Sequence, residues 1–583
     1  MAGAGRGHES TVVFVNADVV TMDERRPTAQ AVAIRGGRIL AVGELDAVLA
    51  AAGSDARTVD LGGRTLIPGF VDGHGDFTQV ARELDWVDLA PPPAGVTSSI
   101  AELLALLRGR LGRLAAEHKY ILGVGYDDSM LDERRHPTKE DLDRVSTRLP
   151  IWVVHASRQM AVGNSMALDQ AGIAASTPDP VGGTQPGIVR RPDSREPTGL
   201  LQDAAWAHVR LTFFPAIPDH HHPDLLRRTG EHYARLGITT AHDGGTDVSG
   251  MKMLRAAAEE GSLPVDVVCY PLYQLAERMR GDTAPHRRDY VGRVRVGGLK
   301  IVLDGAPQRR SAWLTEPYLV PPLGEPASYG GLPSFTDEDV YRMVADCFAH
   351  DVQLVAHANG DAAAEQLIEA VARAARKQGG QGRQDQSGGQ DRRPVMVNAQ
   401  TVREDQLDRM RALGILPSFS STHCFFWGDW HVASVLGRDR AYRMSPARSA
   451  ARRGMRFSLH DDSPVVSPDV LFLLWSAVTR LSRGGEVIGV DQQLTPAEAL
   501  RAVTIDAAYQ HFEEAEKGSL EVGKLADMAV LSANPLRVAS EAIKEIAVLA
   551  TLKEGVPIYI RERAPLPESL VTAHVEGGAG AAR

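Results

Sequence analysis

The sequence has few cysteines, few aromatic residues and no long apolar run. Its three cysteines, Cys269, Cys347 and Cys424, lack the short spacing of a zinc finger. Cysteine this sparse does not support a disulfide framework and favours a reducing compartment. No stretch of about 18 apolar residues predicts a transmembrane helix, and the N-terminal segment MAGAGRGHES lacks a signal-peptide core. We therefore predict a cytoplasmic location.

The sequence also has no long basic run. Its 64 Lys and Arg residues are interspersed with 74 Asp and Glu residues, and the net charge is −10. This distribution argues against nucleic acid or an anionic membrane as the main partner. The 583 residues are 43% hydrophobic and 24% charged, as in ordinary globular proteins, and they predict more than one structural unit. We expect a small-molecule substrate.

Both ends of the chain contain short segments rich in Val and Ile, separated by turn signals such as Gly36-Gly37. These segments predict one β-sandwich domain formed jointly by residues 1–66 and 515–583. The candidate strands are Thr11–Val15, Ala31–Arg35, Ile39–Val42, Thr58–Asp60, Gly518–Val530 and Val548–Ile560.

The middle of the chain, residues 67–514, alternates short apolar runs with helical patterns such as Ala362–Arg376, Glu404–Leu413 and Ser467–Arg480. Repeated β-α units predict an α/β fold with parallel strands, and eight units predict a (β/α)8 TIM-type barrel. The candidate strands are Leu66–His74, Ile238–Asp243, Val265–Tyr270, Gly298–Leu303, Val352–His357, Val395–Asn398, Ile415–Phe419 and Met455–His460.

Two segments interrupt this alternation. Residues 77–235 separate the first two candidate strands and include a helical Ile100–Glu117 and a strand-like Ile151–His155, so we predict an inserted subdomain. Residues 378–393 are rich in Gly and Gln, and a flexible surface loop is expected there.

Several candidate strands end in a residue that can bind a metal or move a proton. In a parallel barrel these ends meet on one face, where catalysis takes place. Alternation along a strand directs His74 and Asp76 the same way, and imidazole and carboxylate are both ligands for first-row metals. One such histidine is more often structural, but their recurrence at successive strand ends predicts a site. The residues are His74, Asp76, Lys300, His357, Asn398, His460 and Asp462.

Several longer motifs resemble the amidohydrolase superfamily, and in particular its family 3 branch of YtcJ-like proteins and N-substituted formamide deformylases. The segment PGFVDGHGD is similar to the PGxxDxHxH strand, and LKIVLDGAPQRRSAWL to the VKxxxDGSxxxRTAxL segment of that branch. HANGDAA, FSLHDDSPVVSPDV and GSLEVGKLADMAVL resemble its further signatures. The resemblance covers nearly the whole chain.

The resemblance implies a metal-dependent hydrolase that holds one or two divalent ions, zinc among them. His74 matches the first histidine of the HxH strand, Lys300 the lysine that is often carboxylated, and His357 the fifth-strand histidine. Asp462 matches the aspartate that binds metal and also handles the proton of the attacking water. Barrels of this kind commonly form dimers, so a homodimer is expected.

Three positions depart from the family pattern. Asp76 and Asn398 stand where histidines are expected, and Gln159 stands where relatives often have GH. Carboxylate for imidazole shifts preference from zinc toward manganese, iron or magnesium, and an amide oxygen is a weaker ligand. Three interpretations follow: a re-tuned mononuclear site, metal-free or non-hydrolytic chemistry in the same pocket, and a barrel that has lost metal and catalysis.

Loop residues near the strand ends are candidates for substrate binding, because aromatic side chains suit an apolar pocket wall. Packing within the long loops is an equally good explanation for them. The candidates are Tyr126, Asp127, Gln159, Asp304, Arg309, Trp313, His423 and Trp427.

The pattern as a whole predicts hydrolysis of a C–N bond, of amide or N-acyl or N-formyl type, by a metal-activated water. Asp462 is the expected general base. The alternatives are isomerisation, elimination, decarboxylation or cyclisation without hydrolysis, in which His357 and His460 would act, or a barrel that binds a small molecule without turnover.

Overall fold

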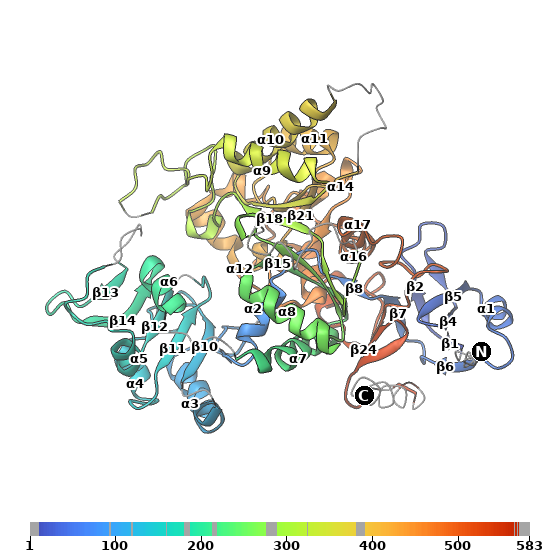
Figure 1. The fold of residues 1–583 in the computed structure, drawn as a ribbon, viewed down its shortest axis with the longest axis horizontal. Helices are drawn as coiled ribbons and strands as arrows, with labels where there is room; N and C mark the ends of the chain where they lie inside the picture. Colours follow the sequence, from blue (N-terminus) through green and yellow to red (C-terminus); the bar gives the residue numbers. More distant parts are fainter. Residues whose placement is uncertain are drawn as a thin grey trace, which may run out of the picture. The chain divides into compact units, whose positions relative to one another are not determined.

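The computed structural model describes residues 11–92, 95–117, 120–158, 160–179, 187–212, 218–275, 289–322, 324–379, 391–564, 566–567 and 570. The chain divides into two compact units. One unit consists of Met1–Ala81 together with Asp219–Arg583, and the other of Arg82–Pro218 (Figure 1).

The two ends of the chain form two sheets of the first unit. One sheet has the order β5-β4-β1-β6, and the other has the order β25-β24-β23-β7-β2-β3. Their bounds are β1 Val12–Val15, β2 Asp18–Val20, β3 Thr28–Ala29, β4 Ala31–Arg35, β5 Arg38–Gly43, β6 Arg57–Asp60, β7 Thr65–Pro68, β23 Met528–Leu531, β24 Val548–Lys553 and β25 Val556–Ile560.

Apolar side chains from both terminal sheets share one core. Phe14 and Val32 come from the first sheet, and Leu66, Met528 and Val530 come from the second. Leu66 of β7 pairs antiparallel with Val530 of β23, so residues from opposite ends of the chain are neighbours in one sheet.

The other strands of the first unit are parallel and pair in sequence order. β8 (Phe70–Val71), β15 (Ile238–Thr246) and β16 (Asp266–Pro271) belong to one sheet, and β18 (Gly298–Val302), β19 (Gln353–Ala358), β20 (Val395–Asn398), β21 (Leu416–Phe419) and β22 (Ser458–Leu459) to another. Parallel bridges Leu272–Lys300 and Gly75–Ser463 link these two sheets. Each predicted central strand therefore has a counterpart among the described residues.

Some strand boundaries differ from the prediction. Leu66–His74 is not one strand, because β7 pairs with β23 in the terminal sheet and only β8 pairs with β15. The break falls at Gly69, where a Cβ would lie 2.4 Å from Thr239 Cγ2. Met455–His460 contains only the two-residue β22, and Gly518–Val530 is extended only from Met528. A short strand that we did not predict, β17 (Val294–Val296), pairs with β16.

Helices lie between the parallel strands (Figure 1). Thr336 caps α9 (Asp337–Ala349) by accepting from the Asp339 N–H, and α10 (Asp361–Gly379), α11 (Glu404–Leu413) and α15 (Val470–Thr479) match the three predicted helical stretches. α10 includes the first residues of the predicted 378–393 loop, and residues 380–390 lie outside the described residues. No described helix is both long and apolar enough to span a membrane.

The second unit contains a sheet of order β13-β14-β12-β11-β10-β9. β9 (Val87–Asp88), β10 (Ile121–Tyr126) and β11 (Ile151–His155) are parallel, whereas β12 (Met160–Gly163), β14 (Pro197–Gln202) and β13 (Ile188–Arg190) continue antiparallel. The predicted helix and strand match α3 (Ile100–Glu117) and β11. The unit is shorter than the predicted 77–235 insert, because α7 (His222–Arg235) packs on β15 within the first unit.

Candidate active site

Two predicted residues, Lys300 and Asp462, lie close to the predicted residue His74. The Nε2 atom of His74 lies 3.2 Å from Lys300 Nζ and 3.5 Å from Asp462 Oδ1. His74 follows β8, Lys300 lies in β18 and Asp462 follows β22. The side chains of His74 and Lys300 are buried, so both are shielded from bulk water.

Asp76 follows His74 and forms a backbone bridge to Asp243. Its Oδ1 atom is buried and has no hydrogen-bond partner among the described residues. Burial raises the pKa of Asp76 to about 6, with a further rise from the Asp243 and Asp462 charges and an opposing effect of Lys300. A buried carboxylate oxygen without a donor is costly unless a proton or a cation satisfies it.

Asp462 has the opposite electrostatic setting. Burial alone would raise its pKa, but the interactions with His460, His423, His357 and Lys300 outweigh burial and hold the pKa below its ordinary value. Asp462 is therefore ionised at neutral pH. Its φ is 60° and that of Asn398 is 70°, a left-handed backbone that non-glycine residues seldom adopt and that clusters at functional sites.

Asn398 and His460 contact each other, and the His460 ring also meets the His74 ring edge-on, with the ring centroids 5.2 Å apart. Asn398 Oδ1 lies 2.8 Å from His460 Nε2, and Ser418 Oγ lies 2.8 Å from His460 Nδ1. Burial lowers the pKa of His460 to about 3, so this imidazole is neutral and donates Nε2–H to the amide oxygen. The Asn398 oxygen is thus already used within the protein.

His357 and Asp304 are neighbours at the ends of β18 and β19. His357 Nδ1 lies 3.5 Å from Asp304 Oδ1, and its Nε2 lies 3.1 Å from Asn359 Nδ2. The Asp304 carboxylate also accepts from the backbone N–H groups of Trp313 (3.0 Å), Asn359 (2.9 Å) and Gly360 (2.7 Å). These hydrogen bonds hold the segments at Trp313 and at Asn359-Gly360 against the end of β18.

The remaining predicted substrate-binding residues belong to different elements of the chain. His423, in α12 (Thr422–Trp430), has its Nε2 3.9 Å from Asp462 Oδ2, and its ring meets that of Trp427 edge-on. Arg309 lies in a 3-10 turn, Pro307–Arg309. Tyr126 and Asp127 belong to the second unit, and Gln159 lies outside the described residues.

Comparison with known proteins places this arrangement in a family. The model of the amidohydrolase family matches residues 57–559 of the chain. The chain belongs to the amidohydrolase family. This amidohydrolase is 28% identical to the N-substituted formamide deformylase of Arthrobacter pascens, over 94% of this chain and 98% of that protein. It is 26% identical to the YtcJ protein of Bacillus subtilis, over 93% and 98%. The predicted resemblance is confirmed.

Solved structures share the fold of this amidohydrolase. A metal-dependent hydrolase from Pyrococcus horikoshii superposes with a TM-score of 0.72 at 21% identity, over 91% of this chain and 99% of that chain. A second one, from Pyrococcus furiosus, gives 0.70 at 22% identity, over 90% and 100%. The α/β fold of this hydrolase family, predicted from the sequence, is thereby supported.

One buried histidine at the site of this amidohydrolase was not predicted from the sequence. The His242 ring, in β15, lies 4.8 Å from that of His74 edge-on, and its Nδ1 is 3.0 Å from the Gly75 carbonyl oxygen. Gly244 makes the approach possible, since a Cβ there would lie 2.2 Å from His74 Cε1. The signal was present in the sequence, because the second predicted strand, Ile238–Asp243, ends in His242-Asp243, just as several other predicted strands end in ionisable residues.

Proposed function

We propose that this chain hydrolyses a C–N bond of a small molecule, of the amide, N-acyl or N-formyl type. The observation that carries the proposal is the convergence of His74 Nε2, Lys300 Nζ and the ionised Asp462 at the carboxyl ends of parallel strands. The Arthrobacter relative is named an N-substituted formamide deformylase, which supports this substrate class. The pairing order and the two bridges also support a closed (β/α)8 barrel.

We propose one divalent first-row cation as cofactor, held by His74, Asp76 and Asp462, with Lys300 as a further ligand in its carboxylated form, since an ammonium group has no lone pair to donate. The residues fit such an ion, because the unsatisfied Asp76 oxygen, an imidazole nitrogen and an ionised carboxylate form a mixed N/O donor set. Asn398 is not included, since His460 uses its amide oxygen. When bound, the cation supplies Lewis acidity that makes a water nucleophilic at neutral pH.

Within this site Asp462 moves the proton. Its depressed pKa keeps it ionised, so it accepts a proton from the attacking water and then delivers that proton to the leaving nitrogen. His423 and His74, 3.9 Å and 3.5 Å from its two oxygens, orient the carboxylate. Burial of His74 excludes bulk water from this exchange.

Removal of divalent metal is expected to abolish hydrolysis. Protein stripped with a chelator should lose release of amine from a panel of N-formyl and N-acyl amines, and added Zn²⁺ or Mn²⁺ should restore it, because the water needs the cation to act at neutral pH. Circular dichroism before and after stripping is the control for folding. Undiminished amine release from stripped, folded protein would contradict the metal-dependent mechanism and favour metal-free chemistry.

A further inference from the structure

A second group of ionisable side chains lies within the second unit, where two parallel strands end side by side. Tyr126, the last residue of β10, is the register partner of His155, the last residue of β11. Asp127 and Asp128 follow Tyr126 directly. Two carboxylates and one imidazole therefore emerge at the carboxyl ends of neighbouring parallel strands, the edge at which open α/β sheets bind ligands.

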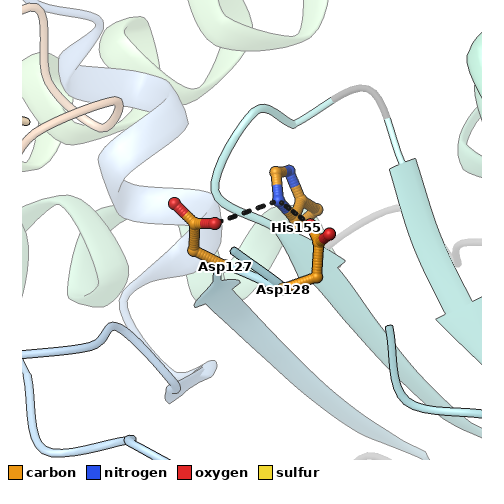
Figure 2. A group of neighbouring side chains, drawn as sticks. All are labelled: Asp127, Asp128 and His155. Atoms are coloured by element: carbon orange, nitrogen blue, oxygen red, sulfur yellow. Dashed lines mark ion pairs between the residues drawn. The ribbon is translucent and has the colours of Figure 1, made fainter. Parts of the chain in front are cut away.

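The distances within this group suit a single bound ion. His155 Nε2 lies 3.1 Å from Asp128 Oδ1 and 3.9 Å from Asp127 Oδ1. One potential ligand atom from each residue lies within 4.8 Å of the other two, and Figure 2 shows the imidazole directed at both carboxylates. Two ligand atoms that each lie about 2.1 Å from one tetrahedral ion are about 3.4 Å apart.

The nitrogen that faces the two carboxylates lacks a hydrogen bond. His155 is 9% exposed, and its Nε2 atom is buried without a hydrogen-bond partner among the described residues. The other nitrogen is held by Ser157, whose backbone N–H lies 3.0 Å and whose hydroxyl lies 2.8 Å from Nδ1. These contacts fix the ring, with Nδ1 accepting the Ser157 N–H. A cation at Nε2 requires the opposite tautomer, in which the Ser157 hydroxyl accepts the Nδ1 proton and the Ser157 N–H gives up its acceptor.

Neighbouring groups orient the carboxylates. Asp127 Oδ1 accepts from the Ser129 N–H (3.0 Å) and hydroxyl (2.6 Å). His136 Nδ1 lies 3.6 Å from Asp128 Oδ1 and 3.1 Å from the hydroxyl of the buried Tyr126. These contacts hold both carboxylates beside the His155 ring.

We propose that Asp127, Asp128 and His155 bind a first-row divalent cation, Zn²⁺ in preference to Mg²⁺ or Ca²⁺, at a site built by the second unit alone. Two carboxylates attract a divalent cation, and the imidazole selects against the hard ions, which take oxygen ligands. The ion would fasten the segment that follows β10 to the end of β11. This site is independent of the cofactor proposed for His74 and Asp462.

The test measures metal content of the full-length chain. Chelator-stripped protein is dialysed against buffered Zn²⁺, and bound zinc per chain is determined by mass spectrometry. Asp128→Asn and His155→Gln should each bind one equivalent fewer than the unmodified chain, with at least a tenfold weaker Kd for that equivalent. The matched control is Asp132→Asn, since Asp132 is an exposed aspartate of the same segment, and it should bind zinc like the unmodified chain.

The two metal proposals are distinguished by Asp462→Asn, which should keep the equivalent that Asp128→Asn loses. If the barrel holds no metal, the unmodified chain binds only that one equivalent. Zinc should also raise the melting temperature of the unmodified chain and of Asp132→Asn by more than that of His155→Gln. A cooperative melting transition in each variant verifies that it is folded. Equal zinc binding by folded Asp128→Asn, His155→Gln and the unmodified chain would overturn the proposal and leave a His155–Asp128 ion pair in its place.

Discussion

The Asp462→Asn variant is expected to lose C–N bond hydrolysis by about 10²–10⁴-fold in kcat, the usual contribution of a positioned general acid–base group. Asparagine preserves the size of the side chain but cannot accept a proton from water. The loss should exceed that from removing a charge alone, because His460, His423, His357 and Lys300 hold the Asp462 pKa low so that it is ionised. Steady-state kinetics on an N-formyl or N-acyl amine measures the effect.

The adjacent residue provides the matched control. Asp461 is buried, and burial together with the Asp469 and Asp72 charges raises its pKa well above the ordinary value. Asp461→Asn keeps the shape of a side chain whose charged form is disfavoured there, and it should keep kcat within a few-fold. Equal losses in the two variants would assign the effect to local structure, and full activity in Asp462→Asn would remove Asp462 from the mechanism.

The Asp266→Asn variant is expected to be destabilised by about 3–5 kcal/mol, the usual cost of removing one partner from a buried ion pair. Asp266 Oδ2 lies 2.7 Å from Lys517 Nζ and 2.6 Å from Lys553 Nζ, and both lysine side chains are almost fully buried. The amide leaves these two ammonium groups without their shared carboxylate. Urea unfolding at pH 7, followed by fluorescence and circular dichroism, measures the difference.

Two further measurements separate this electrostatic effect from a packing defect. Burial would raise the Asp266 pKa, but Lys517 and Lys553 lower it below the ordinary value of an aspartate. Its stabilisation is therefore complete above about pH 4 and is lost as the pH falls toward the folded-state pKa. The difference between Asp266→Asn and the unmodified chain should therefore shrink below about pH 4.

The double variant Asp266→Asn/Lys517→Met should be less destabilised than Asp266→Asn, because Glu513 keeps Arg295 as a partner at 3.3 Å. Additive losses in the double variant would contradict an ionic origin. The control Asp491→Asn alters an exposed aspartate and should change stability by less than about 0.5 kcal/mol.

Much of the fold could be predicted from local sequence patterns. β20 and α11 begin and end where the apolar period and the flanking residues predict, since a strand buried on both faces reads as a continuous apolar run. The division of Leu66–His74 between two sheets could not be predicted in this way. Residues 66–71 have no polar side chain, and only the pairing of Leu66 with Val530 shows that the first half of this segment belongs to a different sheet.

The candidate site was predictable at the level of residue types but not of contacts. Strand ends and motifs pointed to His74, Lys300 and Asp462, and the structure places His74 Nε2 3.2 Å from Lys300 Nζ and 3.5 Å from Asp462 Oδ1. The pairing of Asn398 with His460 and the place of His242 beside His74 depend on how neighbouring strands align. Such alignments are long-range, and no local pattern records them.

The pairing of β7 between β2 and β23 has a consequence for synthesis of the chain. Translation proceeds at about 5–20 residues per second, so β7 leaves the ribosome on the order of tens of seconds before its partner β23 is made. Meanwhile its buried residues, Thr65–Pro68, present an apolar, unpaired edge of the kind that chaperones bind and that seeds aggregation. Nascent chains that end before Met528 should accordingly associate with chaperones, whereas full-length chains should be released.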